Sequence, residues 1–393
     1  MKKSSKFGRW FKSITKQIQL GLIVIALFLI APATIQKVFD IYQSLNPYLE
    51  NRDILATNTK LDLRYKLPNY SDVSWAKQNF EDRKKMKAQY QDFIVWRRGI
   101  YNSETINIDS NGLRRTYVPK DKDDQLTVWM FGGSTMWGNG VNDDNTIPSL
   151  LAKKTGAQVK NFGEGGYIVR QELNTLNKAY SEAPTLAGNQ ERIVIFYDGV
   201  NDGAGHCVKG NSEISTDRQN QIRTAFRSYF ENPSALTFDY LIQPAVMLVN
   251  KISIKIFGKN DPKSRREFWS CDTVPEQADF IARSIVNDWI SANAIAKARG
   301  DRFIAILQPV SFLSDSRFDH LVIAGQGIED LEAMGNQYKT VYPLIKKHAN
   351  NANIEFYDFT AVFDLPEFIY IDYCHVSHQG NEIVAKEIMS ILK

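Results

Sequence analysis

Four short polar motifs stand out because each lies at or just beyond a run of β-prone residues or close to the C-terminus. They are Gly-Gly-Ser-Thr at 132–135, Asn-Phe-Gly-Glu-Gly-Gly at 161–166, Asp-Gly-Val-Asn-Asp at 198–202 and Asp-Tyr-Cys-His at 372–375. Each motif alone is commonplace, since glycine, asparagine and aspartate are ordinary turn formers. In open parallel sheets, however, function gathers at the C-terminal ends of the strands. The four motifs in this order therefore predict a shared site.

Together the motifs contain the parts of an activated serine. A nucleophilic serine needs a base within hydrogen-bond reach, and that base needs a carboxylate to orient it. Ser134 at a glycine turn can expose its hydroxyl, His375 can be the base, and Asp372 can orient the base. The developing oxyanion also needs donors, which the backbone N–H of Gly166 and the side-chain amide of Asn201 can supply.

This pattern resembles the SGNH (GDSL-like) hydrolase superfamily, over roughly residues 105–393, with its blocks standing as GGST, NFGEGG, GVND and DYCH. The resemblance implies Ser134 as nucleophile with Asp372 and His375 as its partners. It also implies an oxyanion hole made by the Ser134 N–H, Gly166 and Asn201. The activity implied is a serine-dependent esterase, and we expect neither a metal nor a cofactor.

Several alternatives remain open around these motifs. The aspartate that usually precedes the serine in this superfamily is Gly133 here. Gly163 and Gly165 compete with Gly166, which we choose because the second glycine of Asn-x-Gly-x-x-Gly matches the superfamily block. His378 is a rival base, although we expect it to be an exposed residue near the start of the last helix. A metal site of Cys374, His375 and His378 is disfavoured because no second ligand cluster accompanies it.

Alternating strands and helices must position these motifs. Runs rich in Val, Ile, Phe and Tyr predict strands at 126–131, 157–161, 193–197, 303–307 and 354–358. Periodic apolar spacing predicts helices at 147–154, 275–298, 330–348 and 380–392. The prediction is a three-layer α/β/α, flavodoxin-like SGNH fold with a parallel five-stranded sheet.

The regular alternation of strands and helices is interrupted at residues 203–275, a segment too long for a simple crossover between two strands. We interpret it as a helical insertion, with a lid or membrane-resting element as the sharper alternative. Cys207 and Cys271 flank it and favour a disulfide over two free thiols if this part of the chain is exported. Cys374 would then be free.

The N-terminal region explains the net charge of +4. Residues 1–16 carry six lysines and arginines and no acid, and without them 42 basic residues face 44 acidic ones. The uncharged run 17–36 is long enough to span a bilayer as a helix, and positive flanks stay cytoplasmic. We therefore predict a cytoplasmic tail, a single transmembrane anchor at 17–36 and an exported remainder, with a cleaved signal peptide as the alternative.

Residues 37–104 form the predicted membrane-proximal connector, and we expect its charge run at 76–100 to be solvated and partly amphipathic. The nearly neutral remainder argues against nucleic-acid binding. The expected substrate is an O-acyl ester of a periplasmic or extracellular glycan, either hydrolysed or transferred to a sugar hydroxyl. A lipase or lysophospholipase is the enzyme alternative, and a non-catalytic glycan-binding or assembly protein is the alternative outside enzymes. The sequence does not predict an oligomeric state.

Overall fold

The computed structural model describes the chain from Asp62 to Leu392, apart from residues 121–122, 184–185, 187, 209–213, 217, 221, 224–268, 318 and 325–328. These residues belong to one compact unit that begins at Asp62. The predicted tail 1–16, the predicted anchor 17–36 and most of the predicted insertion lie outside the described residues. Among the described helices, none is long and apolar enough to cross a bilayer.

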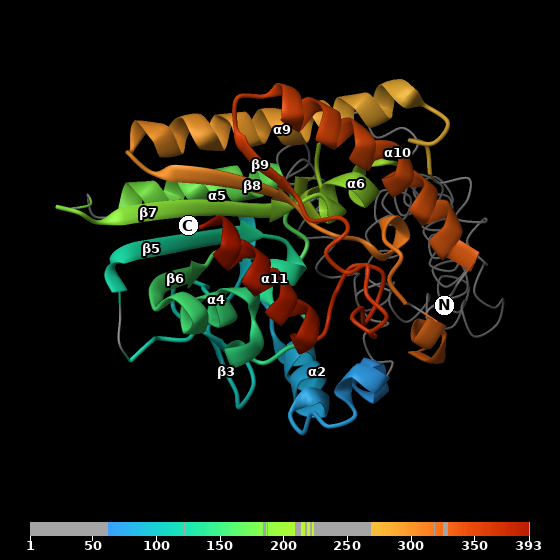
Figure 1. Cartoon of the computed structure of the whole chain (residues 1–393), viewed down its shortest axis with the longest axis horizontal. Coiled ribbons are helices and arrows are strands. Elements are labelled where there is room, and N and C mark those ends of the chain that lie inside the picture. The colour runs from blue at the N-terminus through green and yellow to red at the C-terminus, as the bar shows by residue number, and fades with distance from the viewer. Residues whose placement is uncertain are drawn as a thin grey trace, which may run out of the picture. The chain divides into compact units, whose positions relative to one another are not determined.

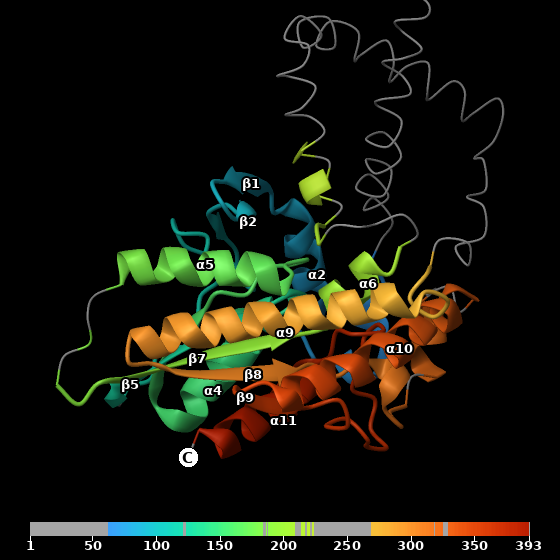
Figure 2. The same cartoon turned by 90° about the horizontal axis from the view of Figure 1, so that it is seen from above.

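A parallel five-stranded sheet runs through the centre of the unit (Figures 1 and 2). Its strands, in chain order, are β5 (Asp123–Gly132), β6 (Ala157–Asn161), β7 (Glu191–Asp198), β8 (Arg302–Leu307) and β9 (Glu355–Asp358). Their spatial order is β6-β5-β7-β8-β9, and all four pairings are parallel. This is the 2-1-3-4-5 order of a flavodoxin-like sheet, which places a switch point between β5 and β7. The predicted parallel five-stranded sheet is confirmed.

Helices cover both faces of the sheet and make three layers (Figure 1). One face carries α5 (Val169–Glu182), α9 (Pro275–Ala298) and α10 (Glu329–Asn351), and the other carries α4 (Ile147–Thr155) and α11 (His378–Ile391). Alternation along the buried strands supplies both interfaces, because successive side chains point to opposite faces. In β7, for example, Val194 and Phe196 pack with the α9 layer, whereas Ile193, Ile195 and Tyr197 pack with the α4 layer.

Two short hairpins and a helix precede the sheet in sequence. They are α2 (Ala76–Lys85), the antiparallel pair β1 (Ala88–Gln91) and β2 (Val95–Arg98), and the pair β3 (Tyr101–Asn102) and β4 (Asn107–Ile108). The described part of the predicted connector packs into the same unit as the sheet. Leu67 and Phe80 are buried in the core beneath the α4 layer.

The sequence led us to expect a solvated charge run at 76–100. Arg97 departs from that expectation. Its side chain is 2 % exposed, and its guanidinium donates to the carbonyls of Gly112 and Phe162. The expectation is therefore wrong for this residue: its cation ties the β1–β2 hairpin to the loop after β6.

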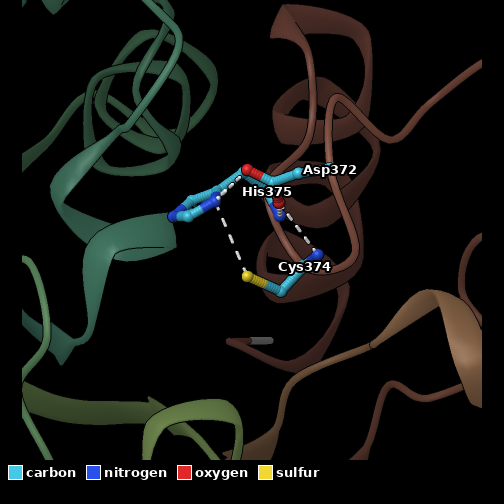
Figure 3. A group of neighbouring side chains, drawn as sticks. All are labelled: Asp372, Cys374 and His375. Atoms are coloured by element: carbon cyan, nitrogen blue, oxygen red, sulfur yellow. Dashed lines mark hydrogen bonds and ion pairs between the residues drawn. The ribbon is translucent and has the colours of Figure 1, made fainter. Parts of the chain in front are cut away.

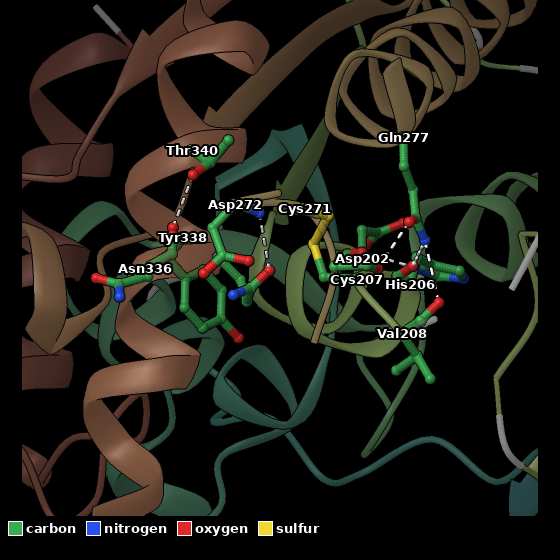
Figure 4. The surroundings of a disulfide bond; sticks show 12 residues. Asp202, His206, Cys207, Val208, Cys271, Asp272, Gln277, Asn336, Tyr338 and Thr340 are labelled. Carbon is green, nitrogen blue, oxygen red and sulfur yellow. Dashed lines mark hydrogen bonds between the residues drawn. A yellow bond between two sulfur atoms is a disulfide. The ribbon is translucent and has the colours of Figure 1, made fainter. Parts of the chain in front are cut away.

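A disulfide between Cys207 and Cys271 closes the predicted insertion at its two ends (Figure 4). Cys207 follows α6 (Val200–His206), and Ser270 donates its N–H to the Cys207 carbonyl at 2.9 Å. Both sulfurs are buried beside α9 in the core. The bridge that the sequence favoured is thus present, and it holds the end of the helix that carries Asn201.

Candidate active site

Ser134 lies where β5 ends and the short helix α3 (Ser134–Trp137) begins. A Cβ at Gly132 would approach the Tyr197 carbonyl oxygen to 2.8 Å, so only glycine allows β5 to turn so close to β7. Gly138, with φ of +97°, ends α3 in the left-handed region. Between residues 131 and 140, Ser134 alone is partly exposed. The turn therefore presents one hydroxyl from an otherwise buried segment.

Asp372 and His375 share a narrow turn that follows β9. The Ile371 N–H donates to the His375 carbonyl at 2.8 Å, and the Ser377 N–H donates to the Ile369 carbonyl at 2.9 Å. Inside this turn, Asp372 Oδ1 accepts the backbone N–H groups of Cys374 at 3.0 Å and His375 at 2.7 Å. The three-residue spacing thus has a local cause, since the aspartate caps its own turn in the manner of an Asx turn.

The two segments meet in a continuous chain of hydrogen bonds. His375 Nε2 lies 2.6 Å from Ser134 Oγ, and His375 Nδ1 lies 2.7 Å from Asp372 Oδ2 (the latter contact is drawn in Figure 3). An ionised carboxylate only accepts, so the proton sits on Nδ1 and leaves Nε2 free to accept from the serine hydroxyl. Side-chain exposure is 13 % for His375 and 9 % for Asp372, so the hydrogen bond between them is largely shielded from water.

Charge around Asp372 keeps it ionised. Burial raises the pKa of this carboxyl, but charge interactions and hydrogen bonds with His375, together with the charge of Arg64, outweigh burial. The pKa of Asp372 is consequently held well below its usual range. Arg64 Nη1 donates directly to Asp372 Oδ2 at 2.6 Å.

The three glycines of the second motif differ in what their N–H groups do. The Gly163 N–H donates to Asn161 Oδ1 at 3.0 Å, and the Gly165 N–H donates to Glu164 Oε1 at 2.7 Å. The Gly166 N–H has no acceptor within the described part of the chain. Gly166 is also partly exposed and has φ of +83°. Of the three candidates, only Gly166 has a free donor to offer.

Asn201 packs against the glycine turn that carries Ser134. Its Nδ2 lies 2.4 Å from the position that a Cβ on Gly133 would occupy. The same Nδ2 donates one hydrogen to the Tyr167 carbonyl at 2.6 Å, which fixes the amide next to Gly166. A primary amide carries two hydrogens, so the second is not used by this bond. Gly133 therefore leaves room for the amide beside Ser134, where a larger residue would displace it.

Three buried acids lie behind Asn201. They are Asp198 at the end of β7, Asp202 on α6 and Glu172 on α5, each at most 3 % exposed. Asp198 accepts from Trp289 Nε1 at 3.2 Å, and Asp202 accepts from the Val169 N–H at 3.3 Å. Burial raises the pKa of all three, that of Asp198 to about 7, so they favour the neutral form.

The structure gives less support to His378 as the base and to a metal site beside His375. His378 begins α11 and packs its ring edge-on against Trp75, with centroids 6.2 Å apart. Ligating atoms of Asp372, Cys374 and His375 do lie within 4.8 Å of one another. His375 Nδ1, however, is already hydrogen-bonded to Asp372 Oδ2 at 2.7 Å. Asp372 also already accepts four hydrogen bonds, so these residues suit a hydrogen-bonded relay better than a metal site.

Sequence reasoning missed two residues that shape the site. Arg64, in the predicted connector, contacts Asp372 from a distance of 308 positions in the chain, and no local pattern marks such a pair. Arg98 forms an ion pair with buried Glu164 and lies over the Trp137 ring, its guanidinium carbon 4.3 Å from the centroid. Nothing in the adjacent Trp-Arg-Arg at 96–98 marks this pairing, because Arg98 and Glu164 are 66 positions apart in the chain.

No model of a known protein family matches the sequence, and no curated protein matches it either. Among solved structures, the chain is similar to a lipolytic protein of the G-D-S-L family from Veillonella parvula, at 11 % identity and a TM-score of 0.38, over 68 % of this chain and 97 % of that one. A putative lipolytic protein of the same family from Desulfitobacterium hafniense is 12 % identical, with a TM-score of 0.36, over 67 % and 98 % of the two chains. A carbohydrate acetylesterase from Sinorhizobium meliloti is 12 % identical, with a TM-score of 0.34, over 68 % and 99 %. Likeness at this level carries no functional inference.

Proposed function

We propose that this protein is a serine esterase of the SGNH type. The observation that carries the proposal is the hydrogen-bond chain from Ser134 through His375 to Asp372, with spacings of 2.6 and 2.7 Å. Such a chain activates a hydroxyl whose free pKa would leave it a weak nucleophile. Its burial and the ionised state of Asp372 support the same role.

The proposed reaction has two steps, acylation of Ser134 and hydrolysis of the acyl-enzyme. His375 Nε2 removes the hydroxyl proton as Ser134 Oγ bonds to the ester carbonyl carbon, and the carbonyl π electrons move to the oxygen. That oxyanion accepts hydrogen bonds from the N–H groups of Ser134 and Gly166 and from Asn201 Nδ2. As the C–O bond to the alcohol breaks, the imidazolium returns its proton to the departing oxygen. Water, deprotonated by His375, then attacks the acyl-enzyme and releases the carboxylic acid and the free serine.

For the substrate we propose an O-acyl group, acetyl first, on a glycan outside the cytoplasmic membrane. The support is the predicted topology, in which the anchor at 17–36 places the remainder outside, and the Cys207–Cys271 disulfide, a bond that persists in oxidising compartments. If a sugar hydroxyl replaces water in the second step, the same residues perform acyl transfer. The apolar stretch 241–257 that suggested a lipase lies outside the described residues.

The test is hydrolysis of p-nitrophenyl acetate by the full chain and by Ser134→Ala. We expect the parent to release nitrophenolate and the variant to lose this activity by at least about 10³-fold while its thermal midpoint is unchanged. Equal activity in the variant would contradict the serine mechanism. A preference for long acyl chains over acetyl favours the lipase, and appearance of acylated sugar in place of free acetate favours transfer. Glycan binding without turnover of any ester favours the non-catalytic role.

Localisation has its own test. Alkaline phosphatase fused after the last residue is active only when it is exported, so we expect an active, membrane-associated fusion. A fusion that is inactive contradicts the proposed topology, and one that is active but soluble supports the cleaved signal peptide over the anchor.

A further inference from the structure

Residues 62–70 lie against the loop that carries Asp372 and His375. They form two short 3-10 turns, Arg64–Lys66 and Pro68–Tyr70. The apolar side chains of Leu67 and Tyr70 are 2 % and 3 % exposed and pack in the core with the side chains of 369–371. We call residues 62–70 the N-terminal clamp.

The clamp holds the backbone of that loop through Asn69. The Asn69 amide donates to the carbonyls of Phe368 at 2.9 Å and Tyr370 at 3.1 Å. Tyr70 donates its hydroxyl to the Gly140 carbonyl at 2.7 Å, in the segment that follows α3. The clamp therefore contacts both chain segments that supply the hydrogen-bond chain, one from the Ser134 side and one from the Asp372 side.

Arg64 adds a charged contact to the hydrogen bonds that Asn69 and Tyr70 donate to backbone carbonyls. Its Nε and Nη2 donate to the two carboxylate oxygens of Asp62 at 3.0 and 2.7 Å, which fixes the plane of the guanidinium. The guanidinium carbon also lies 5.1 Å from the centre of the Phe80 ring. Held in this way, Nη1 donates to Asp372 Oδ2 at 2.6 Å. Arg64 is 12 % exposed, so water screens this contact only weakly.

We propose that the N-terminal clamp positions the Asp372–His375 turn, and that Arg64 is a positioning residue acting through Asp372. The inference rests on the serine mechanism proposed above. Asp372 Oδ2 is shared between His375 Nδ1 and Arg64, so the arginine fixes the carboxylate that in turn fixes the imidazole. This part of the predicted connector, residues 62–70, therefore helps to position the site residues.

A second consequence concerns charge. The charged or titratable groups near Asp372 are Arg64, Asp62, Arg83, His375 and the Cys374 thiol, together with the Tyr70 and Tyr373 hydroxyls. A cation bonded to Asp372 disfavours a second positive charge on the imidazole. Removing that cation should make protonation of the base easier, and activity should then be lost at a higher pH. This shift would appear in the acid limb of the profile of kcat/KM against pH. A residue that only supports the fold would not move that limb.

The experiment compares Arg64→Gln, Arg64→Lys and Asn69→Ala in the full chain, with Arg302→Gln as the matched control. Arg302 also forms a two-point ion pair, with Glu355 at 2.9 and 2.5 Å, but at the opposite ends of the strands. We expect Arg64→Gln to lower kcat/KM for p-nitrophenyl acetate about 10–100-fold, by analogy with the loss of a group that orients a metal ligand. It should also move the acid limb of the kcat/KM profile to higher pH.

The other variants separate position from charge. Asn69→Ala should lower kcat/KM and leave the acid limb in place, because no charge is removed. Arg64→Lys should keep the limb but lose about tenfold, since an ammonium group cannot make the same planar fork. Arg302→Gln should change neither quantity.

Parental kcat/KM and an unmoved limb in both Arg64 variants would overturn the inference while Ser134→Ala still abolishes activity. If Ser134→Ala itself stays active, the proposed function fails first, so the two failures are distinguishable. If Arg64→Gln does not fold, Arg64→Lys decides the matter, because parental kcat/KM in that variant alone would overturn the role of the fork.

Discussion

Replacing Gly133 with alanine is expected to disable the site without unfolding the protein. The backbone there is extended, with φ of −75° and ψ of −151°, so we expect the effect of a methyl group to come mainly from what it touches. The new Cβ would stand 2.4 Å from Asn201 Nδ2, whereas ordinary contact begins near 3.4 Å. The amide must therefore shift, which disturbs its 2.6 Å hydrogen bond to the Tyr167 carbonyl. If Asn201 is an oxyanion donor, as proposed above, its loss should cost about 10²–10³ in kcat, or about 3–4 kcal/mol.

The assay is the initial rate of p-nitrophenyl acetate hydrolysis, with thermal melting as the check on folding. Gly205→Ala is the matched control, because a Cβ at Gly205 on α6 meets no atom within 4 Å. The sharpest comparison uses the double variant Gly133→Ala/Asn201→Ala. If the methyl group acts by displacing the amide, it should cost nothing further once Asn201 has been removed. Full activity in Gly133→Ala, or an equal loss with and without Asn201, would refute the reasoning.

Three further predictions concern stability and the carboxylates. Reducing the Cys207–Cys271 bridge should lower the free energy of unfolding by up to about 4 kcal/mol, given loop-closure entropy over a separation of 64 residues; urea melts with and without reductant measure this, and identical melts would contradict it. Asp198 has a folded-state pKa of about 7 against an ordinary 3.8, so the stability it contributes is complete below pH 4 and is lost as pH rises through 7. Asp198→Asn should therefore show a flatter dependence of unfolding free energy on pH between 4 and 8, and a slope equal to the parent's would sink this assignment. Asp372→Asn should lower kcat by about 10⁴-fold, since the amide no longer fixes the tautomer of His375; a loss under tenfold in steady-state rates would count against the relay.

The parts of the fold that local signals encode could be predicted from the sequence. Each of the five strands was visible as a β-prone run, and the Asp372–His375 turn is local, so its spacing alone brought the pair together. Ser134 followed from a glycine turn at a strand end. The choice of Gly166 over its neighbours rested on motif matching and stays a prediction; the N–H groups of Gly163 and Gly165 already donate to other acceptors.

The contacts of Arg64 and Arg97 could not be predicted, because their partners are far away in the sequence. Arg64 and Asp372 are joined only because the clamp folds back on the last loop, and neither residue belongs to a periodic or spaced pattern. Arg97 sits in a charge run whose composition suggests solvent, yet burial follows from carbonyls supplied by residues up to 66 positions away. A buried arginine looks like a surface arginine in a single sequence, because its partners are distant in the chain.

Covalent trapping of the nucleophile tests the central claim most directly. A fluorophosphonate transfers its phosphonyl group to an activated serine with loss of fluoride, and intact-mass spectrometry of the full chain counts the adducts. We expect one adduct per chain, on the peptide that contains Ser134, with none in Ser134→Ala and slow labelling in His375→Ala. Absence of an adduct in the parent protein, or the same adduct in Ser134→Ala, would contradict the assignment of Ser134 as the nucleophile.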